Sequence, residues 1–131
     1  MRLPTSWNAK LLCALALAAA WPVSAPAAGD PAAGQRHFKR CASCHQVGPN
    51  ARGGFGPQLN GLFGRKAGST PDFNYSEALK ASGLVWDDAT LRAFLKSPGR
   101  AVPGNKMRFW GIGDEGEIDD LLAYLRGFQQ P

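Results

Sequence analysis

The sequence predicts an all-helical fold with few helices and long loops, and three features of its composition lead to this prediction. All 16 glycines lie after residue 27, and the same segment contains only seven Val, Ile and Thr residues. Because β-branched residues favour strands, a sheet is not expected. The segment is also poor in apolar residues, and a domain of this size with a small core generally needs a disulfide, a metal or a cofactor.

The first 27 residues have the layout of a cleaved secretory signal peptide. Arg2 and Lys10 flank its polar start, residues 11–20 consist only of Leu, Ala and Cys, and Ala25-Pro-Ala27 offers a cleavage site. An apolar run of this length crosses only about half of a ~30 Å hydrocarbon core, so a stable membrane anchor is not expected. We therefore expect a signal peptide over residues 1–27 and one domain over 28–131.

The basic charge of the chain belongs partly to this signal. Removal of Arg2 and Lys10 lowers the formal net charge from +5 to +3, and Cys13 is removed with them. The remaining basic residues are scattered, whereas proteins that bind nucleic acid gather Lys and Arg on one face. Nucleic-acid binding is therefore not expected, while a modest basic docking patch remains open.

A first helix is predicted from Asp30 and Pro31 toward Cys41. Aspartate is a favourable cap, and proline suits the first helical position because its missing N–H would have no helical partner. The residues that follow, 46–75, show no helical or strand period and are rich in glycine. A loop of this length is uncommon in a compact domain unless it encloses something functional.

Two further helices are predicted in the second half of the chain. One runs from Asp87 or Asp88 to Lys96 and ends at Pro98, and the other begins near Asp114. The segment 97–113 between them is expected to be a loop. Each helix has a regular apolar face. These faces comprise Leu91, Phe94 and Leu95 in the first of the two, and Ile118, Leu121, Leu122 and Leu125 in the second.

The pentad Cys41-Ala-Ser-Cys44-His45 is the main chemical motif, and four interpretations compete for it. A redox dithiol favours a βαβ context, a zinc site would have only His37 as a further His or Cys ligand, and a short disulfide leaves the histidine unexplained. The fourth interpretation is covalent haem c. Two thiols on one helical turn can each add to a haem vinyl group, forming thioethers, and the next residue can bind iron. Export favours haem c, which is attached on the far side of the membrane.

Met107 is the candidate for the second axial position of such an iron. It is the only methionine after Met1 and lies in the predicted loop over residues 97–113. The ordinary role of a single methionine is to fill a gap in the core. A His/Met ligand pair raises the haem potential relative to two histidines, which suits an electron carrier. His37 is the rival ligand, but it lies four residues before Cys41 on the same helix and is expected at the surface.

The chain closely resembles class I cytochrome c, in the soluble carrier group of mitochondria and alphaproteobacteria. The resemblance rests on the pentad, on Gly56-Pro-Gln-Leu-Asn-Gly-Leu-Phe-Gly-Arg-Lys66 and on Val102-Pro-Gly-Asn-Lys-Met-Arg-Phe109, and it extends from about Gly29 to Phe128. It implies the class I cytochrome c fold, in which three main helices and long loops wrap round one haem. The secretory signal implies the bacterial form, located in the periplasm.

The resemblance also implies a role for individual residues. One haem c would be bound covalently through Cys41 and Cys44, with His45 and Met107 as its iron ligands. The carbonyl of Pro57 would orient the ring of His45, a support that ligating histidines generally have. Further implied haem-binding residues are Arg65, Tyr75, Trp86 and Asn105 near the propionates, together with Phe109.

Three positions depart from the family pattern. Phe94 replaces a tyrosine whose hydroxyl contacts the methionine sulfur, Leu79 replaces an asparagine of an internal water network, and Gly53 replaces a histidine that braces a loop. These changes imply a drier haem pocket with simpler hydrogen bonding.

The resemblance implies a monomeric one-electron carrier that is not an enzyme. It would shuttle electrons between a quinol-oxidising cytochrome complex and a terminal oxidase or another periplasmic redox partner. Docking would be transient and would use a basic haem edge. The candidate docking residues are Arg40, Arg100, Lys106 and Arg108. The alternative is a haem c enzyme or sensor, peroxidase-like or gas-binding, with a labile distal ligand.

Overall fold

Helices and the long loops between them make up residues 28–129, which the computed structural model describes. The predicted signal peptide lies outside these residues. Three main helices agree with the sequence prediction, and two further helices are short. In chain order the helices are α1 (Pro31–Phe38), α2 (Glu77–Ala81), α3 (Asp88–Lys96), α4 (Pro98–Ala101) and α5 (Glu115–Arg126).

Each main helix begins at an aspartate that caps it. The sequence predicted all three starting positions and, for Asp30, the capping role. The carboxylate of Asp30 accepts a hydrogen bond from the N–H of Ala32 at 2.9 Å, and Pro31 occupies the start of α1. Asp87 and Thr90 form a reciprocal capping box at the start of α3. Such caps satisfy N–H groups that have no partner within the helix. Asp114 caps α5 in the same manner.

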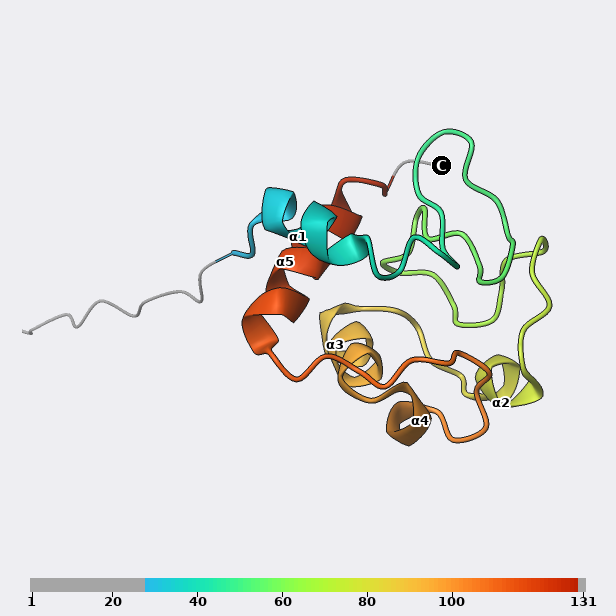
Figure 1. The fold of residues 1–131 in the computed structure, drawn as a ribbon. Coiled ribbons are helices and arrows are strands. Elements are labelled where there is room, and N and C mark those ends of the chain that lie inside the picture. Colours follow the sequence, from blue (N-terminus) through green and yellow to red (C-terminus); the bar gives the residue numbers. More distant parts are fainter. Residues whose placement is uncertain (1–27, 130–131) are drawn as a thin grey trace, which may run out of the picture.

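α1 crosses α5, so that the first and last helices of the described residues pack against each other (Figure 1). Gly34 lies at the crossing, where a Cβ atom would stand 2.0 Å from the carbonyl oxygen of Asp120. The rings of Phe38 and Tyr124 pack with centroids 5.4 Å apart. At the start of α1, the N–H of Asp30 donates to the Asp120 carboxylate at 2.7 Å. The approach of the two backbones therefore depends on glycine.

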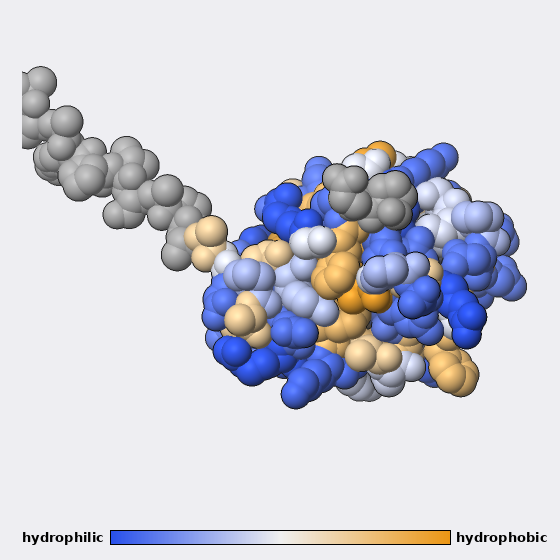
Figure 2. Space-filling model, turned by 90° about the horizontal axis from the view of Figure 1, so that it is seen from above, coloured by the Kyte–Doolittle hydropathy of each residue, from blue (hydrophilic) through white to orange (hydrophobic). Residues whose placement is uncertain are grey.

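The apolar faces of α3 and α5 form the core, and every residue predicted for these faces is buried. Ile118 and Leu121 are among the largest fully buried side chains in the described part of the chain. Figure 2 views the molecule from above and shows hydrophobic residues in a strip across the middle of that face, with hydrophilic residues on both sides. Helices from the second half of the chain therefore supply much of the core.

The second half of the chain differs from the prediction in two places. Pro98 ends α3, as expected, but it also begins α4, so the predicted loop over 97–113 starts with one short helix. Proline is compatible with both roles because its fixed φ suits the first helical position. The helix α2 was not predicted, since five residues are too few to establish a helical period.

The long loop before α2 contains no helix, as predicted for residues 46–75. In place of a sheet, the described residues contain one isolated bridge between Lys66 and Val85. The N–H of Trp86 also donates to the carbonyl of Arg65 at 2.9 Å. These contacts hold the loop against the segment that leads into α3.

Candidate haem site

A cavity of about 720 Å³ opens between the pentad and the loop that contains Met107. This volume lies within the range of ordinary cofactor pockets. A smaller recess continues inward and is lined mainly by apolar residues of α3, α5 and the long loop. His45 and Met107 line both spaces, although 62 positions separate them in the sequence. Cys41 lines both spaces as well, and Cys44 lines the outer one.

The pentad forms a continuation of the helical turns after α1. The N–H of Cys44 donates to the carbonyl of Cys41 at 3.0 Å, and the N–H of His45 donates to the same carbonyl at 2.9 Å. The two sulfur atoms are not joined in a disulfide. Burial raises the pKa of the Cys41 thiol, with Arg40 acting in the opposite direction. Both thiols therefore lie on one turn beside the cavity, as attachment to two vinyl groups requires.

Zinc binding has no support from the geometry. Within residues 28–129 no group of three or more His, Cys, Asp and Glu side chains is placed to hold a metal ion. His37, the only candidate for a further ligand, instead faces α5, with Nε2 3.7 Å from a carboxylate oxygen of Asp120. It does not line the cavity.

His45 is held in one orientation by the backbone. Its Nδ1 lies 2.8 Å from the carbonyl oxygen of Pro57. A carbonyl oxygen only accepts hydrogen bonds, so Nδ1 carries the proton and the lone pair is on Nε2. Burial lowers the pKa of the imidazole, against the effect of the Pro57 hydrogen bond, and Arg65 lowers it further. The ring is therefore prepared as a neutral nitrogen ligand, the form that binds metal.

Arg65 is a half-buried cation that no acidic side chain of the described segment neutralises through an ion pair. Its guanidinium donates to the carbonyl of Asn60 at 2.9 Å and to that of Gln58 at 3.0 Å. Burial lowers its pKa, since the charged form is poorly solvated there. It lines the inner recess together with Tyr75 and Trp86. A buried anionic group such as a propionate would offset this charge, so the recess fits the cofactor.

Tyr75 shows a partner that sequence reasoning missed. Its hydroxyl lies 2.6 Å from Oγ1 of Thr70, and both residues are buried. A buried tyrosine hydroxyl generally requires a hydrogen-bond partner, so a nearby hydroxyl residue was the available signal. The aperiodic loop gave no means of choosing Thr70 over its neighbours. Phe73, which stacks edge-on against Tyr75, is a further cavity residue that was missed.

The side-chain amide of Asn105 forms hydrogen bonds within the chain. Both hydrogen atoms of its amide are used within the chain, since Nδ2 donates to the carbonyl of Pro98 at 2.9 Å and to that of Val102 at 2.8 Å. Its Oδ1 accepts from the N–H of Met107 at 2.9 Å. The side chain of Asn105 thus links the α4 region to the backbone of Met107, while its contact with a propionate stays a prediction. Phe109 lines the cavity beside Met107.

Two of the positions that depart from the family pattern place apolar side chains in the wall of the cavity. Phe94 and Leu79 both line it, and the rings of Phe94 and Trp86 pack edge to face with centroids 5.2 Å apart. Gly53 braces its loop through the backbone, because its N–H donates to the carboxylate of Asp72 at 2.6 Å. A Cβ at Gly53 would lie 2.1 Å from the Asp72 carbonyl oxygen, so the close approach requires glycine.

The predicted docking cations are not equivalent in the structure. Arg40 lines the cavity but forms an ion pair with Glu117 at 2.9 Å. Lys106 and Arg108 line the cavity, and the described residues form no ion pair with either. Arg100 lies on α4 and does not line the cavity. The positive charge at the opening therefore belongs mainly to Lys106 and Arg108.

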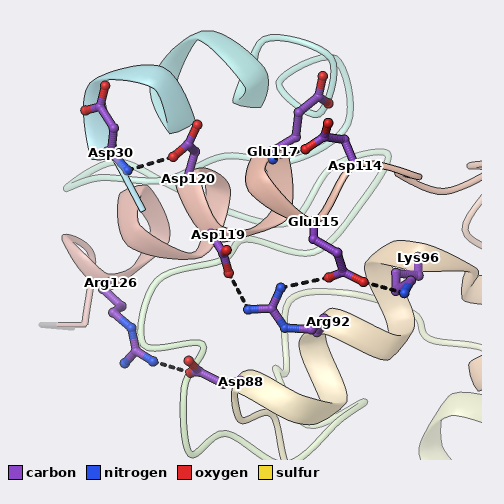
Figure 3. Close-up of polar contacts among 10 residues, drawn as sticks. All are labelled: Asp30, Asp88, Arg92, Lys96, Asp114, Glu115, Glu117, Asp119, Asp120 and Arg126. Carbon is purple, nitrogen blue, oxygen red and sulfur yellow. Dashed lines mark hydrogen bonds and ion pairs between the residues drawn. The ribbon is translucent and has the colours of Figure 1, made fainter. Parts of the chain in front are cut away.

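Other cations of the described segment are neutralised between α3 and α5 (Figure 3). Arg92 pairs with Glu115 at 3.0 Å and with Asp119 at 2.5 Å, and Lys96 shares Glu115. These contacts connect the exposed faces of the two helices.

The sequence matches the family model described as cytochrome c over residues 31–129. The chain belongs to the cytochrome c family. It is 52% identical to cytochrome c2 of Rhodomicrobium vannielii over 105 residues, which are 80% of this chain and 84% of the relative. Identity to cytochrome c2 of Rhodoblastus acidophilus is 50% over 102 residues, 78% of this chain and 95% of the relative. The structure is also similar to cytochrome cH from Methylobacterium extorquens, with a TM-score of 0.71 at 45% identity, covering 76% of this chain and 99% of the other.

Family membership confirms the class I cytochrome c fold and the resemblance on which the sequence interpretation rested. The protein is an electron carrier of the cytochrome c2 type, rather than an enzyme, and its cofactor is haem c bound covalently at Cys41 and Cys44. The cavity fits that group in its two adjacent thiols, its oriented imidazole and its buried guanidinium. None of the helices within residues 28–129 is long and apolar enough to cross a membrane.

Proposed function

We propose that this cytochrome c is a periplasmic one-electron carrier whose haem iron is ligated by His45 and Met107. The observation that supports this most directly is that both side chains line one cavity together with Cys41 and Cys44. We further propose that residues 1–27 are a cleaved signal peptide and that 28–131 form the mature domain, present as a monomer. The donor would be a quinol-oxidising cytochrome complex and the acceptor a terminal oxidase or another periplasmic redox protein.

Individual residues of the chain would have separate roles in such a carrier. Haem c, when bound, supplies an iron that accepts one electron from the donor and gives one to the acceptor. Pro57 holds the proton on Nδ1 of His45, so that Nε2 is available as a ligand without a proton change. Phe94 and Leu79 exclude water from the inner side, and Arg65 offsets the charge of buried carboxylates. A dry and fixed environment keeps reorganisation small when the charge changes.

The alternative function, an enzyme or sensor with a labile distal ligand, is not favoured by the loop that contains Met107. The Met107 backbone N–H is held by Asn105, which is itself tied to two backbone carbonyls of the α4 region. An open distal site would require these hydrogen bonds of Asn105 to break. A persistent Met107 ligand leaves no position for peroxide or a gas.

Docking would use the opening of the cavity, where Lys106 and Arg108 are placed. Two aromatic side chains near this opening are almost fully exposed, Phe55 at 92% and Trp110 at 100%. Phe55 lines the cavity, and Trp110 follows Phe109, which also lines it. Exposed aromatic residues beside positive charge are typical of a protein interface. The partner surface would be acidic with an apolar centre.

The test of docking is the reduction rate of the protein by a quinol-oxidising complex, measured at increasing ionic strength. Electrostatic steering predicts a rate that falls steeply with salt. The variant Arg108→Gln should lower the rate about fivefold at low salt, since one close charge pair in water contributes about 1 kcal/mol. The matched control is Arg100→Gln on α4, which should leave the rate unchanged. A rate insensitive to salt, or an equal loss in both variants, would refute the docking surface.

A further inference from the structure

The loop that presents Met107 is built around the side chain of Asn105. Residues 102–105 form a turn in which the N–H of Asn105 donates to the carbonyl of Val102 at 3.1 Å. Pro103 and Gly104 occupy its centre, and Gly104 has a φ of +84°, the geometry of a type II turn. The turn places the side chain of Asn105 within hydrogen-bonding distance of the Met107 backbone N–H.

The amide of Asn105 then joins the turn to α4. Nδ2 donates to the carbonyl of Pro98 at 2.9 Å and to that of Val102 at 2.8 Å, which are the first residue of α4 and the residue that caps its end. Pro98 is among the fully buried residues, so the anchor point is fixed in the core. Oδ1 accepts from the N–H of Met107 at 2.9 Å. One side chain thus connects buried α4 to the backbone of the candidate ligand.

We propose that Asn105 is a positioning residue that keeps Met107 over the cavity and so opposes its replacement by external ligands. The proposal rests on Met107 being the distal ligand, as proposed above. A foreign ligand can bind the iron only when the loop is open, so its apparent affinity is its intrinsic affinity multiplied by the fraction of molecules with an open loop. The three hydrogen bonds of Asn105 stabilise the closed loop, since opening it breaks them.

The test is the affinity of the ferric holoprotein for imidazole. Bound imidazole replaces Met107, and its binding is followed by loss of the weak long-wavelength absorption band that sulfur ligation gives to ferric haem c. Asn105→Ala should bind imidazole on the order of a hundredfold more tightly, because the loss of three hydrogen bonds at a net ~1 kcal/mol each corresponds to roughly this factor. Asn105→Thr should return the imidazole affinity part of the way to the low parent value, because the threonine hydroxyl can accept a hydrogen bond from the Met107 N–H.

Asn60→Ala is the matched control. Asn60 makes a similar pair of contacts, accepting from the N–H of Gly48 at 2.8 Å and donating to its carbonyl at 2.7 Å, but it does not line the cavity. This variant should be less stable while its imidazole affinity stays at the parent value. Equal affinities in Asn105→Ala and the parent, or an equal gain in Asn60→Ala, would overturn the proposal. Absence of the sulfur band from the parent itself would instead refute Met107 as ligand.

Discussion

At the scale of single residues, the site depends on contacts that few side chains allow. Gly56 is one of them, because its Cα lies against the ring of His45 and a Cβ there would stand 2.7 Å from Cε1. The ring has little freedom to move away, since its Nδ1 is bound to the Pro57 carbonyl. The orientation of the imidazole is thus set from two sides by adjacent residues of one loop.

Replacement of Gly56 by alanine should therefore strain the His45 ring. We expect Gly56→Ala to lower the free energy of unfolding of the holoprotein by about 1–3 kcal/mol, the usual cost of overpacking. Denaturant unfolding of the variant would measure it, and a shift in redox potential should accompany the loss. Gly54→Ala is the control, since a Cβ there would meet nothing within 4 Å. Equal stability and potential in both variants would show that the contact is unimportant.

The roles of individual residues were predictable from the sequence where one short motif contained all of the residues involved. The positions of Cys41, Cys44 and His45 on one turn follow from their spacing, and the contact between His45 and Pro57 followed from the resemblance. The arrangement of Asn105 was not predictable, because its partners depend on α4, a helix that the sequence did not reveal.

At the scale of helices, the molecule depends on the contact between α1 and α5. The sequence predicted α1 from its aspartate cap and its first proline. It predicted α3 and α5 from their apolar periods and from the acidic residues at which they begin. Short helices gave no such signal, and α2 and α4 were missed. A helix is predictable from the apolar residues of the sequence only when it is long enough to show them in a repeating pattern.

Gly34→Ala tests the crossing of α1 and α5. The new Cβ would stand 2.0 Å from the backbone oxygen of Asp120, so the helices must separate. We expect the free energy of unfolding to fall by about 3 kcal/mol, at the upper end of overpacking costs. In contrast, Gly99→Ala in α4 meets no atom within 4 Å and should be neutral or slightly stabilising. Thermal unfolding of the two holoproteins would separate these outcomes, and similar losses in both would contradict the account.

The ion pairs between α3 and α5 have a definite pH dependence. Hydrogen bonds from Lys96 and Arg92 lower the pKa of the Glu115 carboxyl. A lowered pKa in the folded state means that the carboxylate stabilises the fold above its ordinary pKa and that this contribution is lost as the pH falls through the lower, folded-state value. Because the group is exposed, the contribution is small and should decrease with added salt.

At the scale of the whole molecule, the composition and the cavity have one explanation. A chain with few apolar residues and many glycines encloses a cavity of about 720 Å³ next to its core. The aromatic and aliphatic side chains that line the inner recess would otherwise face a void, which is destabilising. The haem therefore completes the core, and the sequence indicated this need before it indicated the cofactor.

This explanation predicts that the mature chain is largely unfolded without haem. The double variant Cys41→Ala/Cys44→Ala, produced without haem, should show little helical signal in far-ultraviolet circular dichroism at neutral pH. The haem-bound parent is the comparison and should show a cooperative unfolding transition. A haem-free chain with native helix content and a sharp transition would show that the core is complete without the cofactor.

The central claim is that His45 and Met107 hold one haem c in a closed electron-transfer site. The most direct measurement is the absorption spectrum of the ferric holoprotein, compared with that of Met107→Ala. We predict a low-spin spectrum with the weak long-wavelength band of sulfur ligation in the parent and loss of that band in the variant. A high-spin parent, or a band that persists in Met107→Ala, would contradict the account.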